Sequence, residues 1–159
     1  MRTLTALRRT LPLFLVFLAP AALAKDAGPA KPAELPAEAP TLQPAEVAKL
    51  AAAKENRPLF LHVGFKKLYQ QAHIPNSEYF GPATEAEVVE RLKARLAKVP
   101  KTAPIILYCG CCPWERCPNI KAAWRVLREL GFTNAKAMYV AKDFGADWAD
   151  KGYPVASGD

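Results

Sequence analysis

The chain has 159 residues, of which 51% are hydrophobic, and a formal net charge of +7. Basic residues form no block and do not alternate with aromatic residues, so the composition speaks against a nucleic-acid-binding protein. A chain of this length predicts a single domain with one core and no need for disulfide staples.

Residues 1–24 have the pattern of a signal peptide. Their three arginines precede a short apolar run from Leu11 to Leu18, and Ala22-Leu23-Ala24 forms a cleavage signal. The run is too short to cross a bilayer, which takes about 20 residues. We therefore expect an exported bacterial protein, periplasmic or secreted, with no stable membrane insertion after cleavage. Removing three arginines, with no acidic residue beside them, leaves a net charge of +4.

Residues 25–40 are rich in Ala and Pro and contain almost nothing that could be buried, which predicts an extended linker. The remaining residues, 41–159, are expected to form the folded domain. They contain no internal repeat.

Helical and strand patterns alternate along the domain. In chain order they predict a helix over 44–54, a strand over 58–63, a helix over 84–99, a strand over 104–108, a helix over 121–130, a strand over 135–140 and a helix over 147–151. Thr84 and Glu87 predict a capping box, and Gly131 predicts a left-handed helix end. This alternation is typical of an α/β fold with a central parallel sheet covered on both faces.

All four cysteines lie within nine residues, between the strand at 104–108 and a helix that begins near Pro118; they are Cys109, Cys111, Cys112 and Cys117. A helix N-terminus offers free N–H groups and partial positive charge, which lower the pKa of a thiol. Cys117 directly precedes Pro118, so we expect it to cap the helix as a low-pKa thiolate. The loop is the predicted functional site.

Five short motifs follow one another along nearly all of the domain. They are PLFLHV at 58–63, AHIPNS at 72–77, LYC at 107–109, LGF at 130–132 and WADKGYPV at 148–155. In this order they resemble a rhodanese-like domain. The resemblance implies a three-layer fold, with a central parallel sheet and helices on both faces, and sulfurtransferase activity. It also implies that the cysteine directly after the strand, here Cys109, takes a sulfane sulfur as a persulfide cradled by loop amides.

Two features depart from the family pattern. His62-Val63-Gly64 stands where the family usually has Asp-Val-Arg, and the loop that follows Cys109 is several residues longer than usual. Counting from the strand favours Cys109 as the nucleophile, whereas counting back from Gly131 favours Cys112. Both assignments stay open at this point.

The first functional hypothesis is persulfide transfer or thiol-disulfide chemistry without a cofactor. Cys109 or Cys112 would attack the donor sulfur, and Cys117 would resolve or relay it. The residues expected to bind the substrate are Gly110, Cys111, Trp114 and Arg116. The expected partners are a small sulfur-containing anion, a thiol acceptor and a periplasmic redox protein.

Three other interpretations compete with it. The four cysteines, with His62 at a neighbouring strand end, could bind copper or zinc. In an oxidising compartment the cysteines could instead form disulfides that hold the loop. The domain could also be a non-catalytic binding module. Of the two histidines, His73 is expected to fix a turn, and His62 is the functional candidate. Phe65, Tyr108 and Trp114 are expected to shape the pocket.

Overall fold

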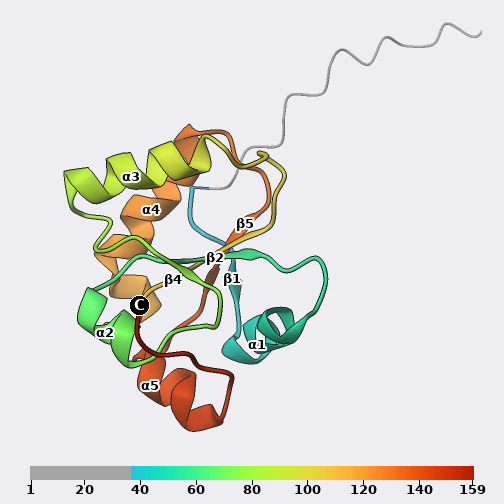
Figure 1. The fold of residues 1–159 in the computed structure, drawn as a ribbon. Helices are drawn as coiled ribbons and strands as arrows, with labels where there is room; N and C mark the ends of the chain where they lie inside the picture. Colours follow the sequence, from blue (N-terminus) through green and yellow to red (C-terminus); the bar gives the residue numbers. More distant parts are fainter. Residues whose placement is uncertain (1–36) are drawn as a thin grey trace, which may run out of the picture. The chain divides into compact units, whose positions relative to one another are not determined.

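The computed structural model describes residues 37–159; the predicted signal peptide and most of the predicted linker lie outside these residues. Five strands form one fully parallel sheet in the order β1-β5-β4-β2-β3 (Figure 1). The strands are β1 (Thr41–Leu42), β2 (Leu59–His62), β3 (Glu78–Tyr79), β4 (Ile105–Tyr108) and β5 (Ala135–Met138). The predicted α/β fold with a parallel sheet is confirmed.

Helices cover both faces of this sheet and make the domain three layers thick (Figure 1). They are α1 (Pro44–Ala52), α2 (Lys66–Gln71), α3 (Ala86–Leu96), α4 (Pro118–Glu129) and α5 (Phe144–Asp147), with 3₁₀ turns at Trp114–Arg116 and Ala149–Lys151. Helices α3 and α4 pack on one face, and α1 and α5 pack on the other. Within residues 37–159, no helix is both long and apolar enough to cross a membrane.

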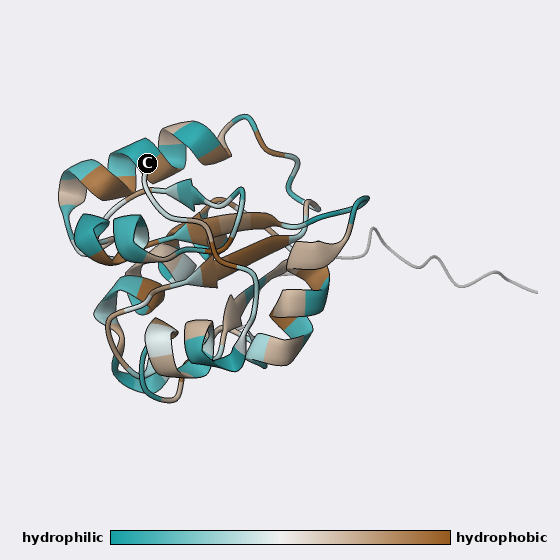
Figure 2. Cartoon of the chain, turned by 60° about the horizontal axis from the view of Figure 1, so that its bottom comes forward, coloured by the Kyte–Doolittle hydropathy of each residue, from teal (hydrophilic) through white to brown (hydrophobic). Residues whose placement is uncertain are grey.

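The buried side chains form two clusters, one on each face of the sheet. Alternation along β4 places Ile105 and Leu107 against α3 and α4, and Ile106 and Tyr108 against α1 and α5. Strand β4 is accordingly apolar along its whole length, and β2 is apolar as far as Leu61. The helices carry hydrophilic residues on their outer sides (Figure 2). Continuous apolar strands are expected in a parallel sheet that is buried on both faces.

Several helix and strand bounds differ from the prediction. The folded part begins before Thr41, because Ala39 is buried and the Pro40 carbonyl accepts a hydrogen bond from the Ala137 amide. The sequence analysis missed β1, α2 and β3, which are too short to show a period. The final segment is the four-residue helix α5 followed by a 3₁₀ turn, not one helix over 147–151.

The two predicted helix ends have different outcomes. Gly131 adopts a φ of 75° after α4, which confirms the left-handed helix end. The capping box at Thr84 is wrong, because Glu85 is the N-cap of α3 and makes no side-chain cap bond. The Thr84 hydroxyl and amide instead donate to Oδ1 of the buried Asn119 on α4, at 3.2 and 3.4 Å.

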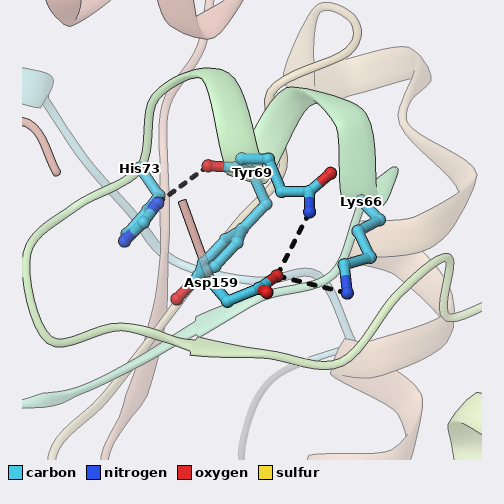
Figure 3. A network of polar contacts seen from close by, with 5 residues as sticks. Lys66, Tyr69, His73 and Asp159 are labelled. Atoms are coloured by element: carbon cyan, nitrogen blue, oxygen red, sulfur yellow. Dashed lines mark hydrogen bonds and ion pairs between the residues drawn. The ribbon is translucent and has the colours of Figure 1, made fainter. Parts of the chain in front are cut away.

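The C-terminal segment is fastened to α2 around His73 (Figure 3). His73 Nδ1 donates to the Tyr69 carbonyl at 2.7 Å, and the two rings stack with centroids 3.8 Å apart. The backbone of His73 exchanges two hydrogen bonds with Ala156, and Asp159 pairs with Lys66 at 3.2 Å. The predicted structural role of His73 is confirmed.

The Tyr108 hydroxyl joins β4 to the segment that leads into β3. It lies 2.6 Å from Ser77 Oγ and accepts the Ile74 amide at 3.2 Å, in a fully buried position. Burial raises the pKa of Tyr108 well above its usual value, so the phenol stays neutral. This tyrosine therefore belongs to the core and serves as a structural link.

We expect Tyr108→Phe to lower the free energy of unfolding by about 1–3 kcal/mol, because it leaves the buried Ile74 amide without its partner. Ser77→Ala should cost less, since it removes only one of the two bonds. Urea denaturation of the two single variants and of the double variant measures these changes in the free energy of unfolding. Equal costs for the two single variants would contradict the proposed link.

Candidate functional site

The cysteine loop lies at the carboxyl edge of the sheet. Cys109 follows the last residue of β4, and the register that pairs Tyr108 with His62 brings the end of β2 beside it. The Val63 amide extends this pairing by donating to the Tyr108 carbonyl at 3.0 Å. Ligands of open α/β sheets bind at this edge, so the topology supports the predicted place of the site.

All four cysteines are free thiols and lie close together. Sγ of Cys111 is 3.3 Å from Sγ of Cys109 and 3.3 Å from Sγ of Cys112. Cys117 shares hydrogen bonds with both Cys109 and Cys112. Cys109 and Cys117 are buried, whereas Cys111 and Cys112 are partly exposed. The loop thus brings together every predicted catalytic cysteine.

The predicted low pKa of Cys117 is wrong. Cys117 is indeed the N-cap of α4, but its hydrogen bond to Cys109 and its burial raise its pKa well above the usual value. Burial likewise raises the pKa of Cys111 to about 11 and also raises that of Cys112. The helix N-terminus is outweighed by neighbouring sulfurs and by desolvation.

Asn119 is a site residue that the sequence analysis missed. It lies in the first turn of α4, is only 3% exposed, and its Nδ2 is 4.0 Å from Sγ of Cys109. Its Oδ1 accepts both hydrogen bonds from Thr84, which fixes the side-chain amide with Nδ2 towards the sulfur. The available signal was a polar residue directly after Cys117-Pro118 on an otherwise apolar helix face.

Because Gly64 has no side chain, the Cys109 sulfur can lie beside its backbone. A Cβ on Gly64 would lie 2.8 Å from Sγ of Cys109 and 3.1 Å from Cε1 of His62. Real Cβ atoms essentially never come within 3.0 Å of such an atom. A side chain at position 64 would therefore require the Cys109 sulfur or the neighbouring backbone to shift.

His62 lies beside the loop as a neutral imidazole. Its ring is 1% exposed and packs among Tyr69, Tyr79 and Tyr108, with centroids 5.0–5.9 Å away. Its Nδ1 accepts the Gly64 amide at 3.3 Å, which assigns the ring proton to Nε2. Burial, with a smaller effect of His73, lowers its pKa to about 4.

The residues predicted to bind substrate belong to the same loop, but part of its backbone is already engaged. The Trp114 amide donates to Val140 at 2.8 Å, and the Arg116 and Cys117 amides close the 3₁₀ turn. Those three amides cannot cradle an anion as well. The Gly110 carbonyl accepts the Phe144 amide at 3.3 Å, so the loop is also tied to α5.

Three residues predicted to bind the substrate or to shape its pocket are either exposed or line a different hollow. Arg116 is exposed, and its charge favours the thiolate of Cys112. Trp114 lines a hollow of about 510 Å³ together with Trp124 and Ile120 of α4. None of the four cysteines lines this hollow. Phe65 is 53% exposed at the start of α2.

The buried neutral His62 makes stability depend on pH. Its pKa is lowered in the folded state, so the unfolded chain binds the extra proton below about pH 6.5 and stability falls as pH falls. Between about pH 7 and pH 4 we expect the free energy of unfolding to fall by about 3 kcal/mol, because each unit of pKa difference contributes roughly 1.4 kcal/mol.

His62→Asn retains an oxygen acceptor for the Gly64 amide and cannot titrate. Chemical denaturation across this range should therefore show a much smaller slope in the variant. An unchanged slope would assign the pH dependence to other groups.

Gly64→Ala tests the contact between β2 and the Cys109 sulfur. We expect it to cost about 1–3 kcal/mol of stability, because the new methyl group overlaps the sulfur. In a Cys109→Ala background the cost in stability should be smaller, because the sulfur that the new methyl group overlaps is absent. A double-mutant cycle on unfolding free energies checks the coupling, and additive costs would count against it.

The comparisons with known proteins agree with this geometry. The family model described as "Rhodanese-like domain" matches residues 43–144. The rhodanese-like domain of the Anabaena protein Alr3790 has a similar solved structure, with a TM-score of 0.53 and 18% identity over 76% of this chain and 80% of that chain. No curated protein sequence matches the chain.

Two sulfurtransferases are also similar in structure. The polysulfide-sulfur transferase of Wolinella succinogenes has a TM-score of 0.54 and 17% identity, over 75% of this chain and 79% of that chain. The single-domain sulfurtransferase RDL2 of Saccharomyces cerevisiae has a TM-score of 0.54 and 18% identity, over 72% of this chain and 92% of that chain. Fold, motif order and family match together place this chain in the rhodanese-like domain family.

Proposed function

We propose that this protein is an exported sulfurtransferase that carries a sulfane sulfur as a persulfide on Cys109. The observation that carries the proposal is the position of Cys109, directly after β4 and beside the start of α4, in a chain of the rhodanese-like family. The signal-peptide pattern of residues 1–24 supports export to the periplasm or beyond.

Three features favour Cys109 over Cys112 as the carrier: a polar neighbour, a space for its sulfur and its burial. Asn119 Nδ2 lies 4.0 Å from the Cys109 sulfur, and Gly64 leaves room for it on the β2 side. Cys109 is buried, whereas Cys112 is partly exposed. A buried persulfide is protected from stray thiols, so the buried cysteine suits a carrier better.

In the loading step, the Cys109 thiolate attacks the outer sulfur of a donor such as thiosulfate. A bond forms between Sγ and that sulfur, the sulfur–sulfur bond of the donor breaks, and sulfite leaves with the electron pair. An acceptor thiolate then attacks the outer sulfur and regenerates Cys109. Neither step needs a cofactor.

Cys117 is placed to resolve the persulfide when no acceptor is present. Its thiol is hydrogen-bonded to Cys109 and can attack the inner sulfur. The outer sulfur takes up the Cys117 proton and leaves as hydrosulfide, and Cys109 and Cys117 are joined in a disulfide. A thiol reductant or a periplasmic redox partner would restore both thiols.

The test is the intact mass of the mature, anaerobically reduced protein before and after thiosulfate. We expect a gain of one sulfur atom that cyanide removes, loss of this gain in Cys109→Ser, and its retention in Cys112→Ser. Cys117→Ser should hold the sulfur longer than the unaltered protein does. If only Cys112→Ser failed to gain the sulfur, Cys112 would be the carrier instead. If Cys109→Ser and Cys112→Ser both gained it fully, the proposal would be refuted.

A further inference from the structure

Three of the four sulfurs form a group that the persulfide chemistry does not require. Sγ atoms of Cys109, Cys111 and Cys117 all lie within 4.8 Å of one another, and among the residues described no other group of His, Cys, Asp or Glu side chains is this compact. They come from the end of β4, the loop and the N-cap of α4. The backbone therefore holds all three before any ligand arrives.

This spacing matches a metal ion with three thiolate ligands. With metal–sulfur distances of about 2.3 Å, three sulfurs around one ion in a plane lie about 4 Å apart. The Sγ atoms of Cys109 and Cys111, now 3.3 Å apart, would have to separate by less than 1 Å. No pair of the three sulfurs is more than 4.8 Å apart, so none is far from the required separation. Small side-chain rotations are sufficient.

Among residues 37–159, no fourth ligand belongs to this compact group. Cys112 is in contact with Cys111 and Cys117 but does not belong to the compact group. His62 has its Nδ1 engaged by the Gly64 amide and its proton on Nε2, so neither nitrogen offers a free lone pair. Structural Zn(II) sites almost always have four ligands in a tetrahedron, whereas Cu(I) is satisfied by three soft thiolates.

We propose that Cys109, Cys111 and Cys117 form a trigonal site for one Cu(I) ion. The proposal does not rest on sulfur transfer, although both would use the Cys109 sulfur. Binding transfers no electrons. Each thiol that becomes a ligand releases its proton to the buffer, and its sulfur donates a lone pair to the ion. The N-terminus of the twelve-residue helix α4 lies beside the resulting negative charge and stabilises it.

The experiment uses the reduced mature protein under anaerobic conditions and Cu(I) held by a chromophoric chelator such as bicinchoninate. We expect transfer of one Cu(I) per chain. Cys109→Ser, Cys111→Ser and Cys117→Ser should each weaken the apparent affinity by roughly 100-fold or more, because two thiolates remain. Cys112→Ser is the matched control and should change it by less than about threefold. Circular dichroism of each variant shows whether the fold is retained.

X-ray absorption at the copper edge gives a readout that needs no variant. Three sulfur neighbours at about 2.3 Å and no nitrogen would support the site. A nitrogen neighbour, an equal effect of Cys112→Ser, a preference for Zn(II), or no transfer from the chelator would each overturn it. Copper transfer and sulfur loading are measured separately. Either proposal can therefore be refuted while the other is supported.

Discussion

The pairing of β2 with β4 sets the positions of nearly every group in the site. Four residue pairs hold the two strands in parallel register, ending with His62 opposite Tyr108. Beyond this pair the Val63 amide still donates to the Tyr108 carbonyl, and Cys109 and Gly64 lie close together at the same edge. A shift of this register by one residue would turn Cys109 to the opposite face of the sheet. The loop chemistry therefore depends on two short, buried strands.

The sequence was informative where a pattern is repeated or a residue type is rare. The continuous apolar runs at 58–63 and 104–108 predict buried parallel strands, and the cysteines next to the second run mark the site without structural information. Gly131 marks the end of α4 because few other residues tolerate a positive φ. These signals are local, and no contact with a distant segment overrides them.

What could not be predicted depends on contacts between distant segments. Thr84 has the sequence pattern of a helix cap, yet its hydroxyl donates to Asn119, 35 residues away. The same contact orients Asn119 towards Cys109. Because Thr84 was interpreted as a helix cap, the sequence analysis did not recognise Asn119 as a site residue. The pKa of Cys117 is another case, because the helix end favours a thiolate while sulfur neighbours and burial favour a thiol.

The crowding of sulfurs also bears on how the loop would hold either of its two proposed ligands. Burial and neighbouring thiols hold Cys111 and Cys117 in the protonated form, so the reduced loop resists random oxidation, which requires thiolates. Under the two proposals, a sulfane sulfur or a Cu(I) ion would take the place of a proton on Cys109. Because both need this sulfur, they exclude each other. The loop would thus hold either a persulfide or a metal ion, and Cys109 would be the point of competition.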